Sequence, residues 1–148
     1  MSTRTNNAID CFKEGFSCSQ AVLAAFSGQQ GLSRDTALKL ADGFGGGMGR
    51  LGMTCGAVTG AMLVIGLQCG RAEAGDHAAK QKTVTLVRRF VRDFTASHGS
   101  ITCHDLLGCD LGTDAGFAFA HDHQLISKHC PVFIADAVEL LESLLAEE

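Results

Sequence analysis

The chain has 148 residues, of which 46% are hydrophobic, and its formal net charge at pH 7 is −4. This length suffices for one compact domain with a sizeable core, and no low-complexity stretch or block of like charges marks a domain boundary. The acidic balance and the absence of Tyr and Trp exclude a nucleic-acid surface built on a basic stripe with aromatic stacking. We expect a single domain over residues 1–148 and no nucleic-acid partner.

Helical patterns follow one another along the chain. Apolar residues recur every three to four positions, with polar residues on the opposite arc, and residues such as Ser33 and Thr102 are typical helix caps. Long helices are predicted over 6–26, 33–42, 54–68, 76–97 and 130–146, with shorter turns over 102–107 and 114–126. No alternating strand pattern accompanies them. The sequence therefore predicts an all-α, single-domain helical bundle of about five main helices.

The segment 51–70 contains no charged residue, so it has to be weighed against a membrane span of about 20 residues. Glycine, threonine and glutamine dilute its apolar character, and its strongly apolar part, 61–67, is short. These features favour a buried central helix over a membrane span. The first 14 residues carry charged side chains and no apolar signal region, which predicts a cytoplasmic location.

A glycine-rich loop, GFGGGMGRLG at 43–52, precedes this central helix. It contains G-x-G-x-x-G at Gly47, Gly49 and Gly52, but no strand precedes the motif and no βαβ unit surrounds it, so it does not indicate a dinucleotide site. Two interpretations stay open. The loop is either a tight turn between helices or a backbone that wraps a bound cofactor or anion with its N–H groups.

Three cysteines stand where a helix is predicted to begin. Cys55 follows the glycine-rich loop, Cys103 lies at the first helical position of a capping-box pattern, and Cys130 directly precedes Pro131. A helix N-terminus favours a thiolate over a thiol, because it offers unpaired N–H groups and a partial positive charge. Since its loop adds further donors, Cys55 is predicted to be the most acidic of them.

The total of seven cysteines is odd, and a structural disulfide framework is rare in a reducing compartment, so metal binding, catalysis or burial explain them better. On one helix, Cys55 and Cys69 would be about 21 Å apart and Cys11 and Cys18 about 10 Å apart. We therefore interpret Cys11 and Cys69 as buried structural residues. No C-x-x-C motif occurs, so a shared site has to be assembled from distant segments.

Four histidines lie in the same segment as the later cysteines. His104 and His129 each adjoin a cysteine and could lower its pKa or replace it as a metal ligand. His121 and His123 are two positions apart, about 200° around a helix, so a solvated helix surface explains them better than a shared metal.

Several segments together resemble a known family. The chain reads CGAVTG at 55–60, matching C-G-A-x-x-G, preceded by FGGG at 44–47 and by GFSCSQAV at 15–22; CHDLLG at 103–108 and a late cysteine at 130 complete the pattern. In these motifs the chain resembles the family of redox-active proteins named after its C_GCAxxG_C_C cysteine pattern. The resemblance spans about residues 12–145.

The resemblance implies that Cys18, Cys55, Cys103 and Cys130 are the family's signature cysteines and that the activity is redox in kind, with an iron–sulfur cluster suspected in some relatives. We call these four the signature cysteines below. Cys109, like the two cysteines interpreted above as structural, falls outside the pattern.

Three functional hypotheses follow. In the leading one, the signature cysteines hold an iron–sulfur cluster for electron transfer or sensing, and Gly45, Gly46, Gly47 and Gly56 bring the backbone against it. In the second, the same thiols carry out thiol–disulfide chemistry without a cofactor. In the third, they form a zinc or soft-metal binding module without turnover. Whether the protein is an enzyme stays open, as do the identity of its redox partner and the option of a homodimer.

Overall fold

The computed structural model describes residues 1–147, and these form eight α-helices. The helices are α1 (Thr3–Lys13), α2 (Cys18–Ser27), α3 (Arg34–Ala41), α4 (Gly56–Cys69), α5 (His77–His98), α6 (Cys103–Leu107), α7 (Asp114–Asp122) and α8 (Leu125–Ala146). Two single-turn 3-10 helices, η1 (Gly28–Gln30) and η2 (Asp42–Phe44), flank α3. The described part of the chain contains no strand, only an isolated β-bridge. The predicted all-α class is therefore confirmed.

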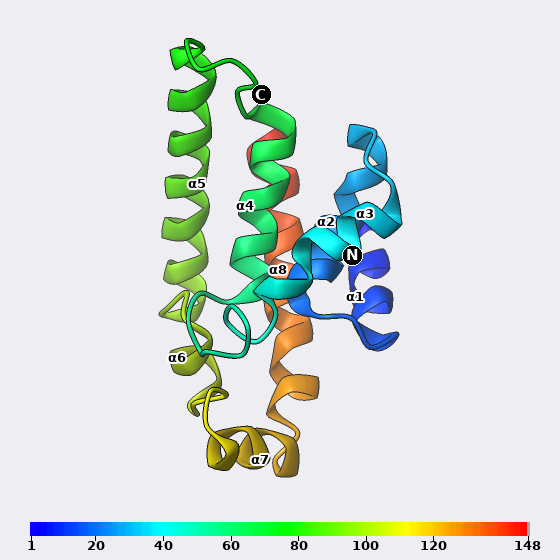
Figure 1. The fold of residues 1–148 in the computed structure, drawn as a ribbon, viewed down its shortest axis with the longest axis vertical. Coiled ribbons are helices and arrows are strands. Elements are labelled where there is room, and N and C mark those ends of the chain that lie inside the picture. The colour runs from blue at the N-terminus through cyan, green and yellow to red at the C-terminus, as the bar shows by residue number, and fades with distance from the viewer. Residues whose placement is uncertain (148) are drawn as a thin grey trace.

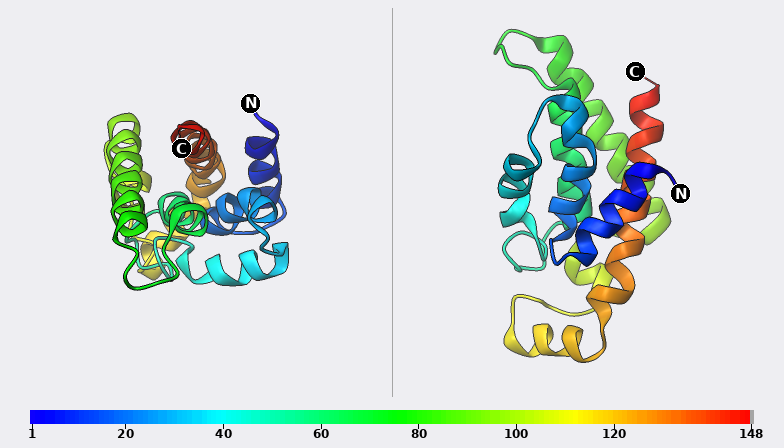
Figure 2. Two further views of the ribbon diagram at one scale, coloured as in Figure 1. Left: turned by 90° about the horizontal axis from the view of Figure 1, so that it is seen from above. Right: turned by 90° about the vertical axis from the view of Figure 1, so that its right-hand side faces the viewer.

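The long helices α4, α5 and α8 run roughly side by side, and α1, α2 and α3 pack on one side of them (Figure 1). Seen along the long axis, α8 stands between α5 and α1 (Figure 2). The glycine-rich loop, 43–52, lies near the N-terminal end of α4, close to α6 (Figure 1). The loop before α4 and helix α6, which are distant in the sequence, thus lie close together.

Helix α4 is the buried centre of the fold. Its residues from Gly56 to Ala61, together with Val64 and Ile65, are buried, so apolar side chains face neighbours on every side. The large side chains of α5 and α8 close the core around it, including Phe90, Phe94 and Ile134. Burying each such side chain contributes about 1.5–3 kcal/mol to folding. The central-helix prediction is confirmed, and none of the helices within residues 1–147 has the length and apolar character of a membrane span.

The first predicted helix, 6–26, is wrong as a single element, because the chain breaks into α1 and α2. Gly15 takes a φ of 112° between them, a conformation open to glycine but not to a helix interior. Ser17 then caps the new helix, accepting from the backbone N–H of Gln20. Cys18 therefore occupies the first position of a helix rather than the edge of a long one.

The predicted start of the last helix at Cys130 is also wrong. Helix α8 begins at Leu125, directly after Gln124 in a left-handed conformation, and Pro131 lies inside it. Proline's fixed φ suits a helix, although its missing N–H removes one hydrogen bond. Cys130 consequently lies in the second turn of α8, away from the exposed N–H groups of the helix terminus.

Candidate redox site

All four signature cysteines line one cavity of about 600 Å³ at the loop end of the bundle. We call it the cysteine cavity. Its other walls are largely apolar, with phenylalanines from α1, α7 and α8 and from the turn before α2; they are Phe12, Phe16, Phe117 and Phe133. Within residues 1–147, Asp42 and Arg50 are the only charged residues in the lining. The structure thus brings together thiols whose positions in the chain span more than a hundred residues.

Cys18 is fixed by the capping of α2. The N–H of Ser17 donates to Gln20 Oε1 at 2.9 Å, and Ser17 Oγ in turn accepts from the N–H of Gln20. This reciprocal capping box satisfies two N–H groups of the helix start. The Gln20 amide also donates to the carbonyl oxygen of Leu38 at 2.9 Å. The S-C-S-Q stretch of the sequence therefore sets both the start of α2 and its attachment to α3.

Cys55 and Cys103 are held together by their backbones. The N–H of Cys55 donates to the carbonyl of Ile101 at 2.7 Å, and the N–H of Cys103 donates to the carbonyl of Met53 at 2.6 Å. The residues that directly precede the two cysteines form an antiparallel β-bridge. We call this pairing the backbone clasp. It places the N-termini of α4 and α6 side by side, each with its cysteine.

Glycines allow these segments to approach closely. A Cβ atom on Gly47 would lie 2.7 Å from Cys103 Cβ, and one on Gly56 would lie 3.2 Å from Cys18 Cβ and 3.0 Å from the backbone nitrogen of Ser19. Any larger residue would push the cysteine-bearing segments apart. Both glycines therefore serve the convergence of the signature cysteines, whatever the cavity binds.

The glycine-rich loop is a self-bonded left-handed turn. Residues 46–50 all have positive φ, including Met48 and Arg50. The loop's N–H groups turn inward: Gly49 donates to the carbonyl of Gly43 at 2.8 Å, and Met53 donates to that of Gly47 at 2.9 Å. The tight-turn interpretation thus describes its conformation. Gly45, Gly46 and Gly47 also line the cysteine cavity, as Gly56 does, so a contact with a bound group stays a prediction.

Burial dominates the electrostatics of Cys55 and Cys103. It raises the pKa of Cys55 to about 11, although the N–H groups of Ala57 and Val58 act in the opposite direction. Burial likewise raises the pKa of Cys103 to about 12, with a smaller contribution from the neighbouring Cys55 and Cys130. The predicted acidity of Cys55 is therefore wrong, because desolvation of the thiolate outweighs the helix N-terminus.

The thiols of Cys18, on α2, and Cys130, on α8, interact closely enough to shift each other's pKa in opposite directions. The Cys18 thiol lowers the pKa of Cys130 against the opposing effect of burial. The same interaction with Cys130, together with burial, raises the pKa of Cys18 well above its ordinary value. Cys130 is therefore the signature cysteine that most readily becomes a thiolate.

The other cysteines lie outside the lining of the cysteine cavity. Cys11 is buried in α1, 3.9 Å from an Arg34 nitrogen, and Cys69 ends α4 in a partly buried position. Cys109 is also partly buried and lies near enough to contribute to the raised pKa of Cys103. No disulfide joins any of the seven cysteines.

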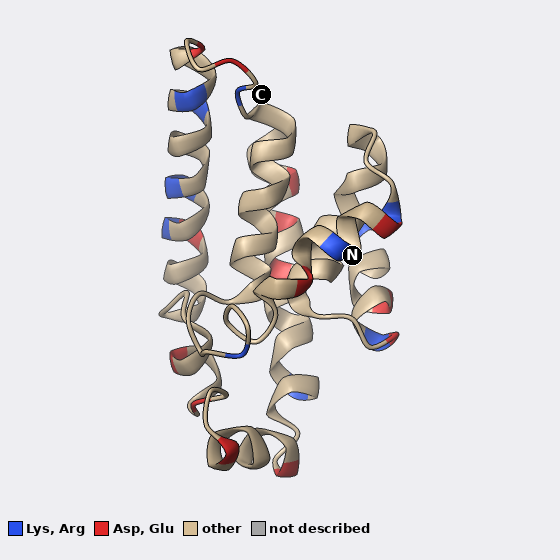
Figure 3. Cartoon of the chain, viewed as in Figure 1, with Lys and Arg blue, Asp and Glu red and all other residues tan. Residues whose placement is uncertain are grey.

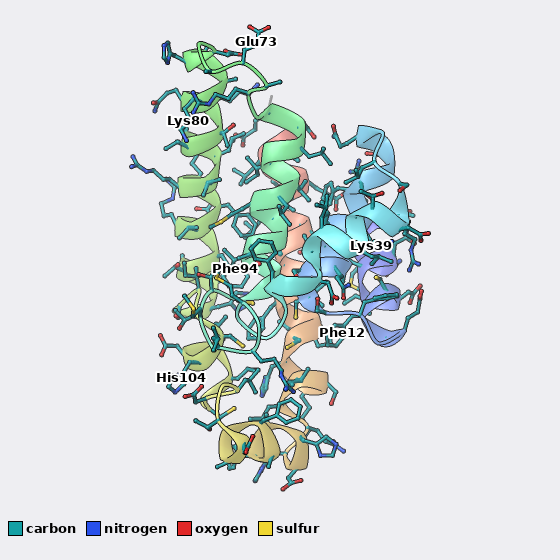
Figure 4. All side chains as sticks on the ribbon, in the orientation of Figure 1. Phe12, Lys39, Glu73, Lys80, Phe94 and His104 are labelled. Atoms are coloured by element: carbon teal, nitrogen blue, oxygen red, sulfur yellow. The ribbon has the colours of Figure 1, made fainter. Side chains whose placement is uncertain are left out.

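The histidines that adjoin signature cysteines point elsewhere. His104 and His129 are exposed and do not line the cysteine cavity. Figure 4 shows His104 on the outer side of α6. Neither imidazole is therefore placed as a ligand in the cavity, and His121 and His123 lie on the exposed surface as predicted.

Sequence reasoning missed the aromatic and charged parts of the lining. Arg50 is the only charged residue from 43 to 70, a signal that could have indicated its special position.

A second group was also missed: His98 Nε2 lies 2.7 Å from Asp136 Oδ2, and the imidazole packs edge-on against Phe133 with ring centroids 5.1 Å apart. His98 ends α5 and both of its partners lie in α8, so no local pattern points to the group.

The signature cysteines offer the donor set of an iron–sulfur cluster, four thiols. They border a cavity rather than a single point, and among residues 1–147 no group of three or more His, Cys, Asp and Glu side chains is arranged to hold one metal ion.

The fold and the cysteine cavity together define a small all-α protein with a buried four-thiol site. Residues 16–144 match the family described as "Putative redox-active protein (C_GCAxxG_C_C)", which covers most of the chain. The protein belongs to this family. Comparisons with curated proteins and with solved structures found no match.

Proposed function

We propose that this protein carries out thiol–disulfide chemistry in the cysteine cavity, with Cys130 as the attacking thiolate and Cys18 as the resolving thiol. The observation that carries the proposal is the pairing of the two thiols at the cysteine cavity, which both line and where the Cys18 thiol lowers the pKa of Cys130. The pair sits on two helices in direct contact, α2 and α8, as a disulfide between them requires.

The exchange runs in two steps. Cys130 attacks one sulfur of a substrate disulfide, which forms a mixed disulfide and releases the first substrate thiolate. That thiolate takes the proton of Cys18, and the Cys18 thiolate attacks the Cys130 sulfur, which releases the second substrate thiolate. The protein dithiol loses two electrons, and the substrate disulfide gains them. Cys55 and Cys103, kept neutral by burial, leave the negative charge on the reacting pair.

A second candidate is the iron–sulfur cluster expected from the sequence. It is favoured by a different observation, the convergence of all four signature cysteines on one cavity. Cys18, Cys55, Cys103 and Cys130 would hold the cluster, which would supply one-electron transfer or redox sensing. Gly47 and Gly56, which abut Cys103 and Cys18, would keep the ligand-bearing backbones close to it.

Anaerobic purification tests both candidates. Thiol–disulfide chemistry predicts protein without stoichiometric iron and sulfide, in which mild oxidation joins Cys18 to Cys130 in a peptide map. The Cys18→Ser variant should lose this disulfide, whereas Cys69→Ser, a change outside the cavity, should keep it. Stoichiometric iron and sulfide with visible absorbance would favour the cluster instead, and metal analysis of the same sample tests the zinc alternative.

We place this chemistry in the cytoplasm, where cellular thiols would return the disulfide to the dithiol. The cytoplasmic location and the redox partner stay predictions, as does the homodimer that the sequence leaves open.

A further inference from the structure

Two opposite charges stand at the cysteine cavity. Asp42, in η2, and Arg50, in the glycine-rich loop, both line it and are both exposed. Within residues 1–147 neither side chain forms an ion pair, with the other or with a third residue. An exposed charged side chain without an ion-pair partner is usually a solvated surface residue. Asp42 and Arg50 differ, because they border a cavity whose remaining wall consists largely of apolar side chains and thiols.

Arg50 is arranged to receive a carboxylate. Its guanidinium carbon lies 4.4 Å from the centroid of the Phe117 ring, so the ring supports one face of the guanidinium plane. Stacking leaves the N–H groups at the edge of the plane available, and these match a carboxylate in a bidentate manner. In Figure 3, basic residues gather mainly along α5, whereas the loop before α4 carries Arg50 alone.

Asp42 supplies the complementary group, a carboxylate that can accept from an ammonium. It lies directly before the loop that carries Arg50, and the backbone between them is fixed by hydrogen bonds such as that from the Arg50 N–H to the carbonyl of Gly45, at 3.1 Å. The two side chains border the same cavity without forming an ion pair with each other. A ligand with one anionic and one cationic group could engage both.

We propose that the cysteine cavity binds a small zwitterionic disulfide of the amino-acid or short-peptide class. Arg50 holds its carboxylate, Asp42 holds its ammonium group, and its sulfurs face Cys130. This substrate assignment rests on the thiol–disulfide function proposed above. The cavity volume of about 600 Å³ lies within the range of about 300–1,000 Å³ that small-molecule sites occupy. Phe12 and Phe16 offer ring contacts to sulfur and methylene groups.

Four small disulfides separate the contributions of charge. Cystine carries both groups, cystamine only ammonium groups, 3,3′-dithiodipropionate only carboxylates, and bis(2-hydroxyethyl) disulfide neither. The reduced full-length protein is mixed with each probe, and the second-order rate of Cys18–Cys130 disulfide formation is measured by acid quench and peptide mapping. Each rate is divided by that for the neutral probe, which removes general effects of a substitution on the dithiol.

In Arg50→Gln, the normalised rate for dithiodipropionate should fall about tenfold, as the loss of a charge-assisted contact implies, while that for cystamine holds. In Asp42→Asn the pattern should reverse. Cystine should lose rate in both variants. Arg88→Gln and Asp10→Asn, which make the same changes of charge outside the cavity lining, should match the unsubstituted protein for every probe.

Normalised rates that are the same in Arg50→Gln, Asp42→Asn and the unsubstituted protein would overturn the substrate assignment and leave the thiol–disulfide function standing. If no probe, the neutral one included, joins Cys18 to Cys130, both proposals fail. Glutathione disulfide shows whether the substrate is an amino-acid or a short-peptide disulfide. A higher normalised rate than that of cystine assigns the short peptide, and a lower one assigns the amino acid.

Discussion

The close packing of the glycine-rich loop against the signature cysteines can be tested by two neighbouring substitutions, Gly47→Ala and Gly49→Ala. Both glycines have similar positive φ values, 75° and 63°. They differ in their surroundings, because a Cβ on Gly47 would meet Met53 N at 2.6 Å and Cys103 Cβ at 2.7 Å, whereas one on Gly49 would meet nothing within 4 Å. Gly49→Ala is therefore a matched control for backbone conformation.

The expected magnitudes follow from these contacts. A left-handed conformation costs an alanine about 1–2 kcal/mol, which applies to both variants. Overpacking against fixed atoms adds about 1–3 kcal/mol for Gly47→Ala alone. We therefore expect the free energy of unfolding to fall by about 1–2 kcal/mol in Gly49→Ala and by about 2–5 kcal/mol in Gly47→Ala.

Urea unfolding of the reduced protein, followed by far-ultraviolet circular dichroism, measures both values. The same samples are then oxidised and mapped, since displacement of the Cys103 segment should alter thiol reactivity in Gly47→Ala but not in Gly49→Ala. Equal losses of stability and identical thiol reactivity would show that the loop does not press on the cysteine-bearing segment, and would refute the packing explanation.

Three further predictions concern the packing and the thiols. Gly60→Ala should lower the free energy of unfolding by about 1–3 kcal/mol, because its Cβ would lie 2.9 Å from a backbone carbonyl oxygen of α2. Gly66→Ala, where a Cβ would meet open space, should raise the free energy of unfolding by about 0.5–1 kcal/mol. The midpoints of urea unfolding compare the two variants. Because the pKa of Cys55 is raised from 9.0 to about 11, stability should be lost as pH rises through this window. Cys55→Ser should reduce the loss of unfolding free energy with pH by up to about 1.4 kcal/mol per pH unit. If urea unfolding across the pH series gives the same loss in both proteins, the raised pKa of Cys55 is contradicted. Cys18→Ala should raise the pKa of Cys130 by removing the thiol that lowers it. Alkylation of Cys130 by iodoacetamide, read site by site, should then begin at higher pH, and an unshifted profile would argue against the pair.

Helix starts with local signals were predictable from the sequence. Ser33 caps α3 and Thr102 caps α6, each accepting from a backbone N–H three residues on. Cys55 stands at the N-cap position of α4, although its side chain makes no capping hydrogen bond. These features depend on a few consecutive residues, because a cap satisfies the N–H groups of its own first turn.

Features that depend on tertiary contacts were not predictable in this way. Helix α8 starts ahead of Pro131, which places Cys130 inside the helix. There the pKa of Cys130 is lowered by Cys18, a residue from a distant part of the chain. The raised pKa of Cys55 has the same origin, since burial depends on the packing of the whole bundle and not on the helix to which a residue belongs. The resemblance to the family indicated the four thiols that line the cavity, but not the direction in which the fold shifts the pKa of each.

The backbone clasp also has a practical consequence for the helical hairpin of α4 and α5. The chain leaves the site at Cys55, runs up α4, returns down α5 and rejoins the site at Cys103, where the clasp fixes both ends. The connection between the two helices, 70–76, is exposed and lies at the far end from the glycine-rich loop (Figure 1). Exposed loop tips are where inserted sequence is best tolerated. This connection is therefore the natural attachment point for a fluorophore, an affinity tag or a fused domain that reports on the thiols without disturbing them.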